Sequence, residues 1–129
     1  MRDLLKSVLL VAIMSAVMLQ QANAREYVEI TPEFVVNYGS GVKLSFMKFK
    51  ISVRLEDPAD ALDVNIHADL IRHEMILLMS RQEGATLGSV EGKVAIQEEA
   101  LELIQKVLME EFGKEMVDRV LFLDFIVQK

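Results

Sequence analysis

Apolar and polar residues alternate in two neighbouring stretches, residues 27–37 and 42–56, which are separated by a glycine-containing turn. A period of two predicts strands with one buried face, and a short turn between two such strands predicts a hairpin. Pro32 cannot donate a ladder hydrogen bond, so we expect the first strand to lie at an edge or to bulge there. The apolar phase of the second strand slips between Phe46 and Met47, which predicts a further bulge. Beyond that point the buried face is predicted to carry Met47, Phe49, Ile51, Val53 and Leu55.

A helical period follows the hairpin. Asp57 and Pro58 form a strong helix start, because an Asp side chain caps free N–H groups and Pro suits the first helical position. The helix is predicted to run to about Ser80 with two apolar stripes on nearly opposite sides, so one can cover the sheet and the other needs a second cover. The first stripe consists of Ala59, Leu62, Ile66, Leu70, His73 and Leu77. The second consists of Val64, Ala68, Ile71, Met75 and Leu78.

Residues 81–88 are polar and predict a loop. Ser89 can cap a second helix over residues 90–112, and Gly113 can end it in a left-handed conformation. The final stretch, residues 117–128, is rich in β-branched and aromatic residues and apolar on both faces, which predicts an inner strand of the sheet. One predicted face carries Val117, Leu121, Leu123, Phe125 and Val127.

The order strand, strand, helix, helix, strand determines the predicted fold class. We expect an α+β fold in which a small three-stranded antiparallel sheet carries two main helices packed on one face. A chain of 129 residues allows one such domain.

Residues 1–24 form an apolar leader before this domain. Arg2 and Lys6 precede an uncharged apolar core, and Ala22-Asn23-Ala24 has the small residues of a cleavage site. We favour a signal peptide cleaved after Ala24, and the alternative is an uncleaved membrane anchor. Since the positive charges precede the apolar core, residues 25–129 are exported in both cases.

Composition and motifs indicate no reaction chemistry. The chain has no cysteine, which excludes disulfides and thiolate metal sites, and its net charge of −6 argues against nucleic acid as a partner. The only histidines, His67 and His73, are separated by about 120° around a helix and cannot share a metal ion. We interpret His73 as a neutral core residue, and His67 and the glutamates of residues 98–102 and 110–115 as exposed surface. We therefore predict no enzymatic activity, metal or cofactor.

The second apolar stripe is the best candidate for a contact with another protein. Its interface residues are predicted to be Val64, Ile71, Met75 and Leu78. The alternative is that the second helix covers this stripe within one chain. Met109, alone in the polar half of the second helix, is a weaker candidate for the same kind of contact.

Several short stretches, in this order along the chain, carry a family resemblance. They are Tyr27-Val28-Glu29-Ile30, Phe34-Val35-Val36-Asn37, Glu56-Asp57-Pro58, Ile71-Arg72, Ile76-Leu77-Leu78-Met79-Ser80, Glu91-Gly92-Lys93, Val120-Leu121-Phe122 and Phe125-Ile126-Val127-Gln128. The set covers almost the whole exported domain and resembles the flagellar basal-body-associated FliL family. Two features depart from that family: the leader looks cleavable and is followed almost directly by the first strand, and Leu123 stands where the family often has Thr.

The resemblance implies a location and a role. It implies a periplasmic domain related to the stomatin-like fold, which lies at the inner membrane, assembles as a homo-oligomeric ring and contacts flagellar stator and basal-body proteins. It further implies support of flagellar rotation, motility and chemotaxis without enzymatic activity. The alternative that we keep open is a stomatin-like periplasmic scaffold for another inner-membrane complex, unrelated to motility.

Overall fold

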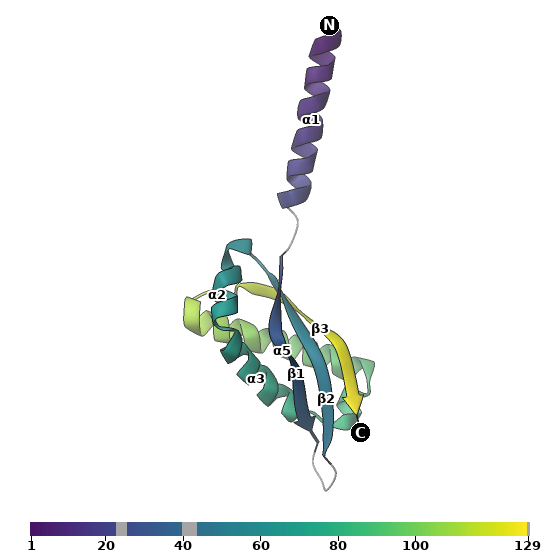
Figure 1. Cartoon of the computed structure of the whole chain (residues 1–129), viewed down its shortest axis with the longest axis vertical. Coiled ribbons are helices and arrows are strands. Elements are labelled where there is room, and N and C mark those ends of the chain that lie inside the picture. Colours follow the sequence, from purple (N-terminus) through teal and green to yellow (C-terminus); the bar gives the residue numbers. More distant parts are fainter. Residues whose placement is uncertain (23–25, 40–43, 129) are drawn as a thin grey trace.

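The computed structural model describes residues 1–22, 26–39 and 44–128, with the side chains of residues 14–22 outside that description. The α+β class and the order of strands and main helices are confirmed (Figure 1). In chain order the elements are α1 (Arg2–Ala22), β1 (Tyr27–Tyr38), β2 (Ser45–Leu55), the 3-10 turn η1 (Pro58–Asp60), α2 (Ala61–Ile66), α3 (Ala68–Ser80), α4 (Gly84–Leu87), α5 (Val90–Phe112) and β3 (Val117–Gln128).

The leader forms helix α1. Among the residues that the structure describes, no helix is both long enough and apolar enough to cross a membrane. The predicted cleavage site after Ala24 and the tip of the predicted hairpin at residues 40–43 lie outside the described residues.

The sheet has the order β1-β2-β3 with antiparallel neighbours, so β2 is the central strand. The prediction that residues 117–128 form an inner strand is wrong, because β3 lies at an edge. Strands joined by a hairpin pair directly with each other, so β1 and β2 leave no slot between them and β3 pairs with the other side of β2. The apolar character of both faces of β3 has another origin: one face packs in the core, and the other leaves Leu123 and Ile126 exposed.

The predicted faces of β3 are also wrong, because its register with β2 shifts twice. Leu123 pairs with Lys50 and Ile126 with Lys48, so two residues of β3 stand opposite one residue of β2 in a β-bulge. Asp124 takes a left-handed conformation in this bulge, with φ of 51°. A strict period of two would separate Phe122 from Phe125, but the bulge lets both rings pack against Phe49, at centroid distances of 5.5 and 5.7 Å.

The β1–β2 hairpin follows the predicted pattern closely. The five residues predicted for the buried face of β2 are all fully buried. The register of β1 shifts between Ile30 and Phe34, around Pro32, and β1 is also an edge strand, so both options predicted for Pro32 hold. The bulge predicted at Phe46 and Met47 is wrong. The pairing with β1 is continuous there, and Phe46 is exposed on the face of the sheet that carries no helix.

The helix boundaries agree with their predicted caps, and the segments between them are less regular than predicted. The Asp57 side chain accepts a hydrogen bond from the N–H of Ala59 at 3.0 Å. The helix predicted to reach Ser80 is interrupted at His67, which separates α2 from α3. The predicted loop 81–88 contains the short helix α4, whose Leu87 is buried in the core.

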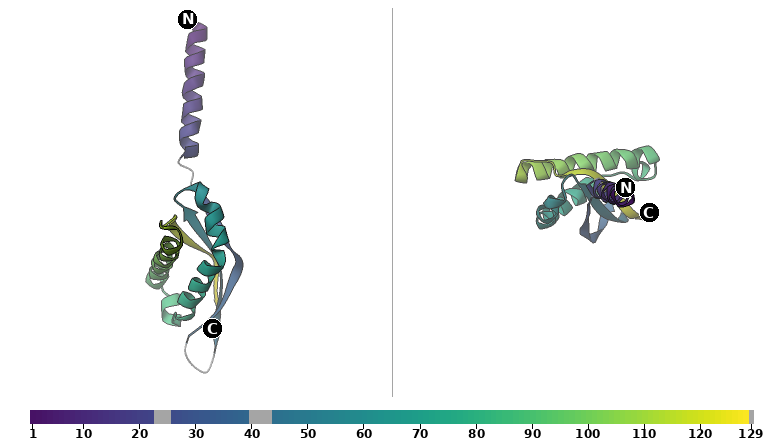
Figure 2. Two further views of the ribbon diagram at one scale, coloured as in Figure 1. Left: turned by 90° about the vertical axis from the view of Figure 1, so that its left-hand side faces the viewer. Right: turned by 90° about the horizontal axis from the view of Figure 1, so that it is seen from above.

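Helix α5 begins and ends as predicted. The Ser89 hydroxyl accepts a hydrogen bond from the N–H of Gly92, and Gly113 ends the helix with φ of 75°. Helices α3 and α5 lie on the same side of the sheet, where α3 packs on β1 and α5 on β3 (Figure 2). The core therefore lies between one helical layer and one sheet, and the two helices flank opposite edges of the sheet.

Candidate interaction surfaces

The four residues predicted as the main interface, Val64, Ile71, Met75 and Leu78, are fully buried in the core of the chain itself. This stripe is therefore covered within one chain, but by the sheet together with α5 and not by the second helix alone. Met109 is different, because its side chain is exposed on the outer face of α5.

The opposite stripe, which we expected to cover the sheet, faces outward. Leu62 and Ile66 keep 68% and 63% of their surface exposed, although both are large and apolar. We call the exposed apolar residues of these two helices the α2–α3 stripe; they are Leu62, Ile66, Leu70, Ile76 and Leu77. The sequence shows two apolar stripes, but it does not show which of them packs against the sheet, because both have helical spacing.

Neither histidine has its predicted surroundings. His73 is exposed beside the α2–α3 stripe, so its interpretation as a core residue is wrong. The reason is that the stripe to which His73 belongs faces outward and does not cover the sheet. His67 is half-buried at the break between α2 and α3, where its ring and the Phe112 ring pack in a T-shaped arrangement with their centroids 4.6 Å apart. Its Nε2 lies 3.6 Å from a carboxylate oxygen of Glu111, so His67 links the break to the end of α5.

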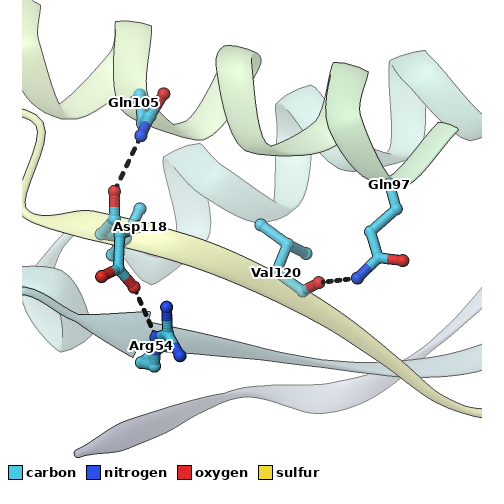
Figure 3. A network of polar contacts seen from close by, with 6 residues as sticks. Arg54, Gln97, Gln105, Asp118 and Val120 are labelled. Atoms are coloured by element: carbon cyan, nitrogen blue, oxygen red, sulfur yellow. Dashed lines mark hydrogen bonds and ion pairs between the residues drawn. The ribbon is translucent and has the colours of Figure 1, made fainter. Parts of the chain in front are cut away.

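Polar side chains of α5 cover the first half of the β3 edge (Figure 3). Gln105 donates a hydrogen bond to the carbonyl of Val117 at 2.9 Å, and Gln97 donates to the carbonyl of Val120 at 2.6 Å. On β2, the Arg54 Nε donates to Asp118 at 2.6 Å, and this hydrogen bond raises the pKa of the Arg54 guanidinium above its ordinary value. The side chains of the helix thereby satisfy backbone groups that an edge strand otherwise leaves unpaired.

A groove opens between the first turns of α5 and the middle of β3. Its cavity has a volume of about 340 Å³. We call it the α5–β3 groove; it is lined by Lys93, Ile96, Gln97, Arg119, Leu121, Phe122 and Phe125. Its floor is apolar and aromatic, and two cationic side chains lie at its rim. Sequence analysis missed this surface, because it depends on the bulge at Asp124 that brings Phe125 to the same face as Phe122.

An ion pair between a buried carboxylate and an exposed lysine anchors the end of α5 and the turn that follows it. Asp60 in η1 is buried, and one of its carboxylate oxygens lies 2.8 Å from the Lys114 Nζ. This hydrogen bond raises the pKa of the Lys114 ammonium above its ordinary value. Among the described residues Lys114 is the side chain that pairs with this buried carboxylate, so the pair fixes the start of the α2–α3 segment against the region before β3.

The acidic side chains do not gather into a cation site. The glutamates of residues 98–102 and 110–115 are exposed, as predicted for a solvated helix face. Within the described part of the chain, no group of three His, Cys, Asp or Glu side chains is arranged to hold a metal ion. The surfaces with distinct chemistry are therefore the α2–α3 stripe and the α5–β3 groove.

A comparison with protein families matches residues 27–128 to the family described as flagellar basal body-associated protein FliL. The match extends from the first residue of β1 to the last residue of β3, and so includes both surfaces. No curated protein matches the chain significantly. The chain thus belongs to the FliL family, whose members are accessory proteins of the flagellar basal body.

Proposed function

We propose that residues 25–129 act in the periplasm at the inner membrane as a non-enzymatic accessory of the flagellar motor, which self-associates and supports the stator units. The observation that carries the proposal is the α2–α3 stripe. Its large apolar side chains are exposed on a domain whose core is complete without them. Large apolar side chains that are exposed along one helical segment indicate a protein–protein contact.

The positions of the apolar surfaces fit self-association into a ring. A closed ring of identical subunits uses two different patches on each subunit, which meet head to tail. The α2–α3 stripe lies on the helices that flank β1, and the exposed Met109 lies on α5, which flanks β3. We propose that the α2–α3 stripe and the surface of α5 around Met109 supply the two halves of the contact.

The leader supports the proposed location. Its basic start, apolar core and small residues at 22–24 are typical of an export signal. In the proposed arrangement the leader is removed after Ala24 or stays as an anchor, and the domain lies outside the cytoplasmic membrane in both cases. The first strand starts at Tyr27, so a retained leader would hold the Tyr27 end of the sheet at the membrane surface.

A photo-crosslinking amino acid at Ile66, introduced in flagellated cells, tests the proposal. We expect adducts that contain two copies of the chain and adducts that contain stator subunits. The matched control carries the same amino acid at Glu29, an exposed residue on the helix-free face of the sheet, and is expected to give neither adduct. Deletion of the gene is expected to reduce swimming in soft agar and in viscous medium.

The outcomes separate the parts of the proposal. If position 66 gives no adduct of two copies, self-association through the α2–α3 stripe is refuted. If its adducts contain other inner-membrane proteins but no stator subunit, and the deletion strain swims normally, the role in the motor is refuted. That second result would instead support a scaffold for another membrane complex.

A further inference from the structure

We propose that the open part of the β3 edge and the α5–β3 groove bind a short extended peptide segment of another protein. The segment carries acidic side chains on either side of a large apolar one and adds to the sheet as a fourth strand. This inference goes beyond the accessory role in the motor and does not depend on it. It rests on three features of the groove: a free strand edge, an apolar cavity beside it, and two cations at the rim.

The first half of the β3 edge is occupied and the next part is open. Gln105 donates a hydrogen bond to the carbonyl of Val117, and Gln97 donates one to the carbonyl of Val120. Alternate residues of an edge strand direct their N–H and C=O groups to the same side, so Phe122 is the next residue to face the free edge. Beyond the ladder with β2, no hydrogen bond to Phe122 exists within the described residues. Extended peptides bind to sheet edges with this kind of unpaired backbone.

The cavity beside this edge fits an apolar side chain. Ile96, Phe122 and Phe125 line it, and Phe125 reaches it because the bulge at Asp124 turns the strand. Successive side chains of an added strand point to opposite faces, so every second side chain of the peptide points toward the cavity. A bulge also protects an edge against long strand pairing, and here it limits the added strand to a few residues around Phe122.

The charges of the groove select an acidic partner. Lys93 and Arg119 lie at the rim, and neither has an ion pair with another described residue. The neighbouring cations Lys50 and Arg54 are already paired with Asp124 and Asp118. The Lys93 Nζ lies 5.8 Å from the centroid of the Phe125 ring. Two cations that line one groove without an ion pair to another described residue are distinctive on a chain with a net charge of −6. They complement carboxylates placed two residues before and after the apolar side chain that enters the cavity.

The test measures binding of a fluorescent peptide, Thr-Glu-Val-Phe-Val-Glu-Thr, to the full chain in mild detergent by fluorescence anisotropy. The Phe side chain and both Glu side chains lie on one face of this peptide when it is extended. We expect saturable binding that weakens about ten-fold when all backbone N–H groups from the first Glu to the second are methylated, because this removes the ladder hydrogen bonds whether the peptide runs parallel or antiparallel to β3. A peptide with Lys in place of both Glu is expected to bind more weakly still.

Variants of the chain locate the site. Lys93→Glu is expected to weaken binding about five-fold, because the substitution places a like charge opposite the peptide. Its matched control is Lys106→Glu, the same charge reversal on the exposed face of the same helix, which is expected to leave binding unchanged. Both variants are expected to retain the wild-type circular dichroism spectrum, since both side chains are exposed.

Three results would overturn the proposal. The first is the absence of binding up to about 1 mM peptide. The second is equal binding of the methylated and unmethylated peptides, or equal weakening by the two lysine variants. The third is a smaller oligomer in the Lys93→Glu variant together with a failure of the wild type to bind peptide, which would assign the groove to a contact between copies. None of these results bears on swimming of the deletion strain, so the motor role is tested separately.

Discussion

Replacement of Gly92 by alanine tests how closely α4 and the start of α5 pack together. A Cβ atom at this position would lie 2.1 Å from the backbone oxygen of Thr86 and 2.6 Å from the Oγ of Ser89. Helix propensity alone predicts that alanine stabilises a helix interior by up to about 1 kcal/mol relative to glycine. The contact with Thr86 opposes this gain, because a backbone oxygen cannot move away by a change of side-chain rotamer.

The structure therefore predicts a loss of stability where propensity predicts a gain. Extra atoms that force a backbone shift cost about 1–3 kcal/mol, so we expect a net loss of about 1–2 kcal/mol. In a domain of this size a loss of 1 kcal/mol lowers the Tm by about 4–8 °C. Urea and thermal unfolding of the full chain, followed by far-UV circular dichroism, measures the change. The groove is linked to this position, because Gly92 precedes Lys93, Ile96 and Gln97 in the same helix.

Gly84→Ala is the matched control. Gly84 begins α4, and the nearest atom to an added Cβ there is the Cε2 of Tyr38, at 4.0 Å. We expect this variant to unfold at the wild-type Tm or slightly above it. A Gly92→Ala variant that equals or exceeds the wild type in stability would refute the proposed packing of α4 against α5.

Further predictions concern the core, the β3 edge and the ion pair between Asp60 and Lys114. Ile71→Ala is expected to lower the free energy of unfolding by about 2–5 kcal/mol, whereas Ile66→Ala on the exposed stripe changes it by no more than about 0.5 kcal/mol. Similar urea midpoints for these two variants would contradict our assignment of the stripes. Gln97→Ala removes the hydrogen bond to Val120 and is expected to cost about 0.5–1.5 kcal/mol in the same assay, and a loss no larger than that of the exposed neighbour variant Glu98→Ala would argue against this role. Because Asp60 raises the pKa of Lys114 above 10.5, the pair stabilises the fold fully below that pH, and the contribution is lost as the pH rises through the raised pKa. The difference in stability between the wild type and Lys114→Gln is therefore expected to be constant from neutral pH to about 10 and to shrink at higher pH, and a difference that does not shrink would count against the pair.

The elements of this fold follow from local patterns in the sequence. The caps at Asp57, Ser89 and Gly113 set helix boundaries that the structure confirms, since they depend on chemistry within one turn. The buried face of β2 is also as predicted, because a central strand under a helical layer keeps a strict period of two. The family, the fold class and the order of the elements were likewise predictable.

The arrangement of the elements was harder to predict, because it depends on choices between similar patterns. Both stripes of the α2–α3 segment have helical spacing, and only the packed structure shows that Ile71 faces inward and Leu62 outward. Two register shifts in β3 reverse the faces of its residues, and the alternation of apolar residues does not reveal them. The α5–β3 groove arises from one of those shifts at Asp124, so it too could not be predicted from the sequence.

The most direct test of the central claim, that the chain supports the motor through its α2–α3 stripe, is swimming in soft agar by cells whose only copy of the gene carries Leu62→Asp and Ile66→Asp. Both side chains are exposed, so we expect the variant to fold and to accumulate as the wild type does. We expect these cells to swim as poorly as the deletion strain. Swimming at the wild-type rate would contradict the central claim.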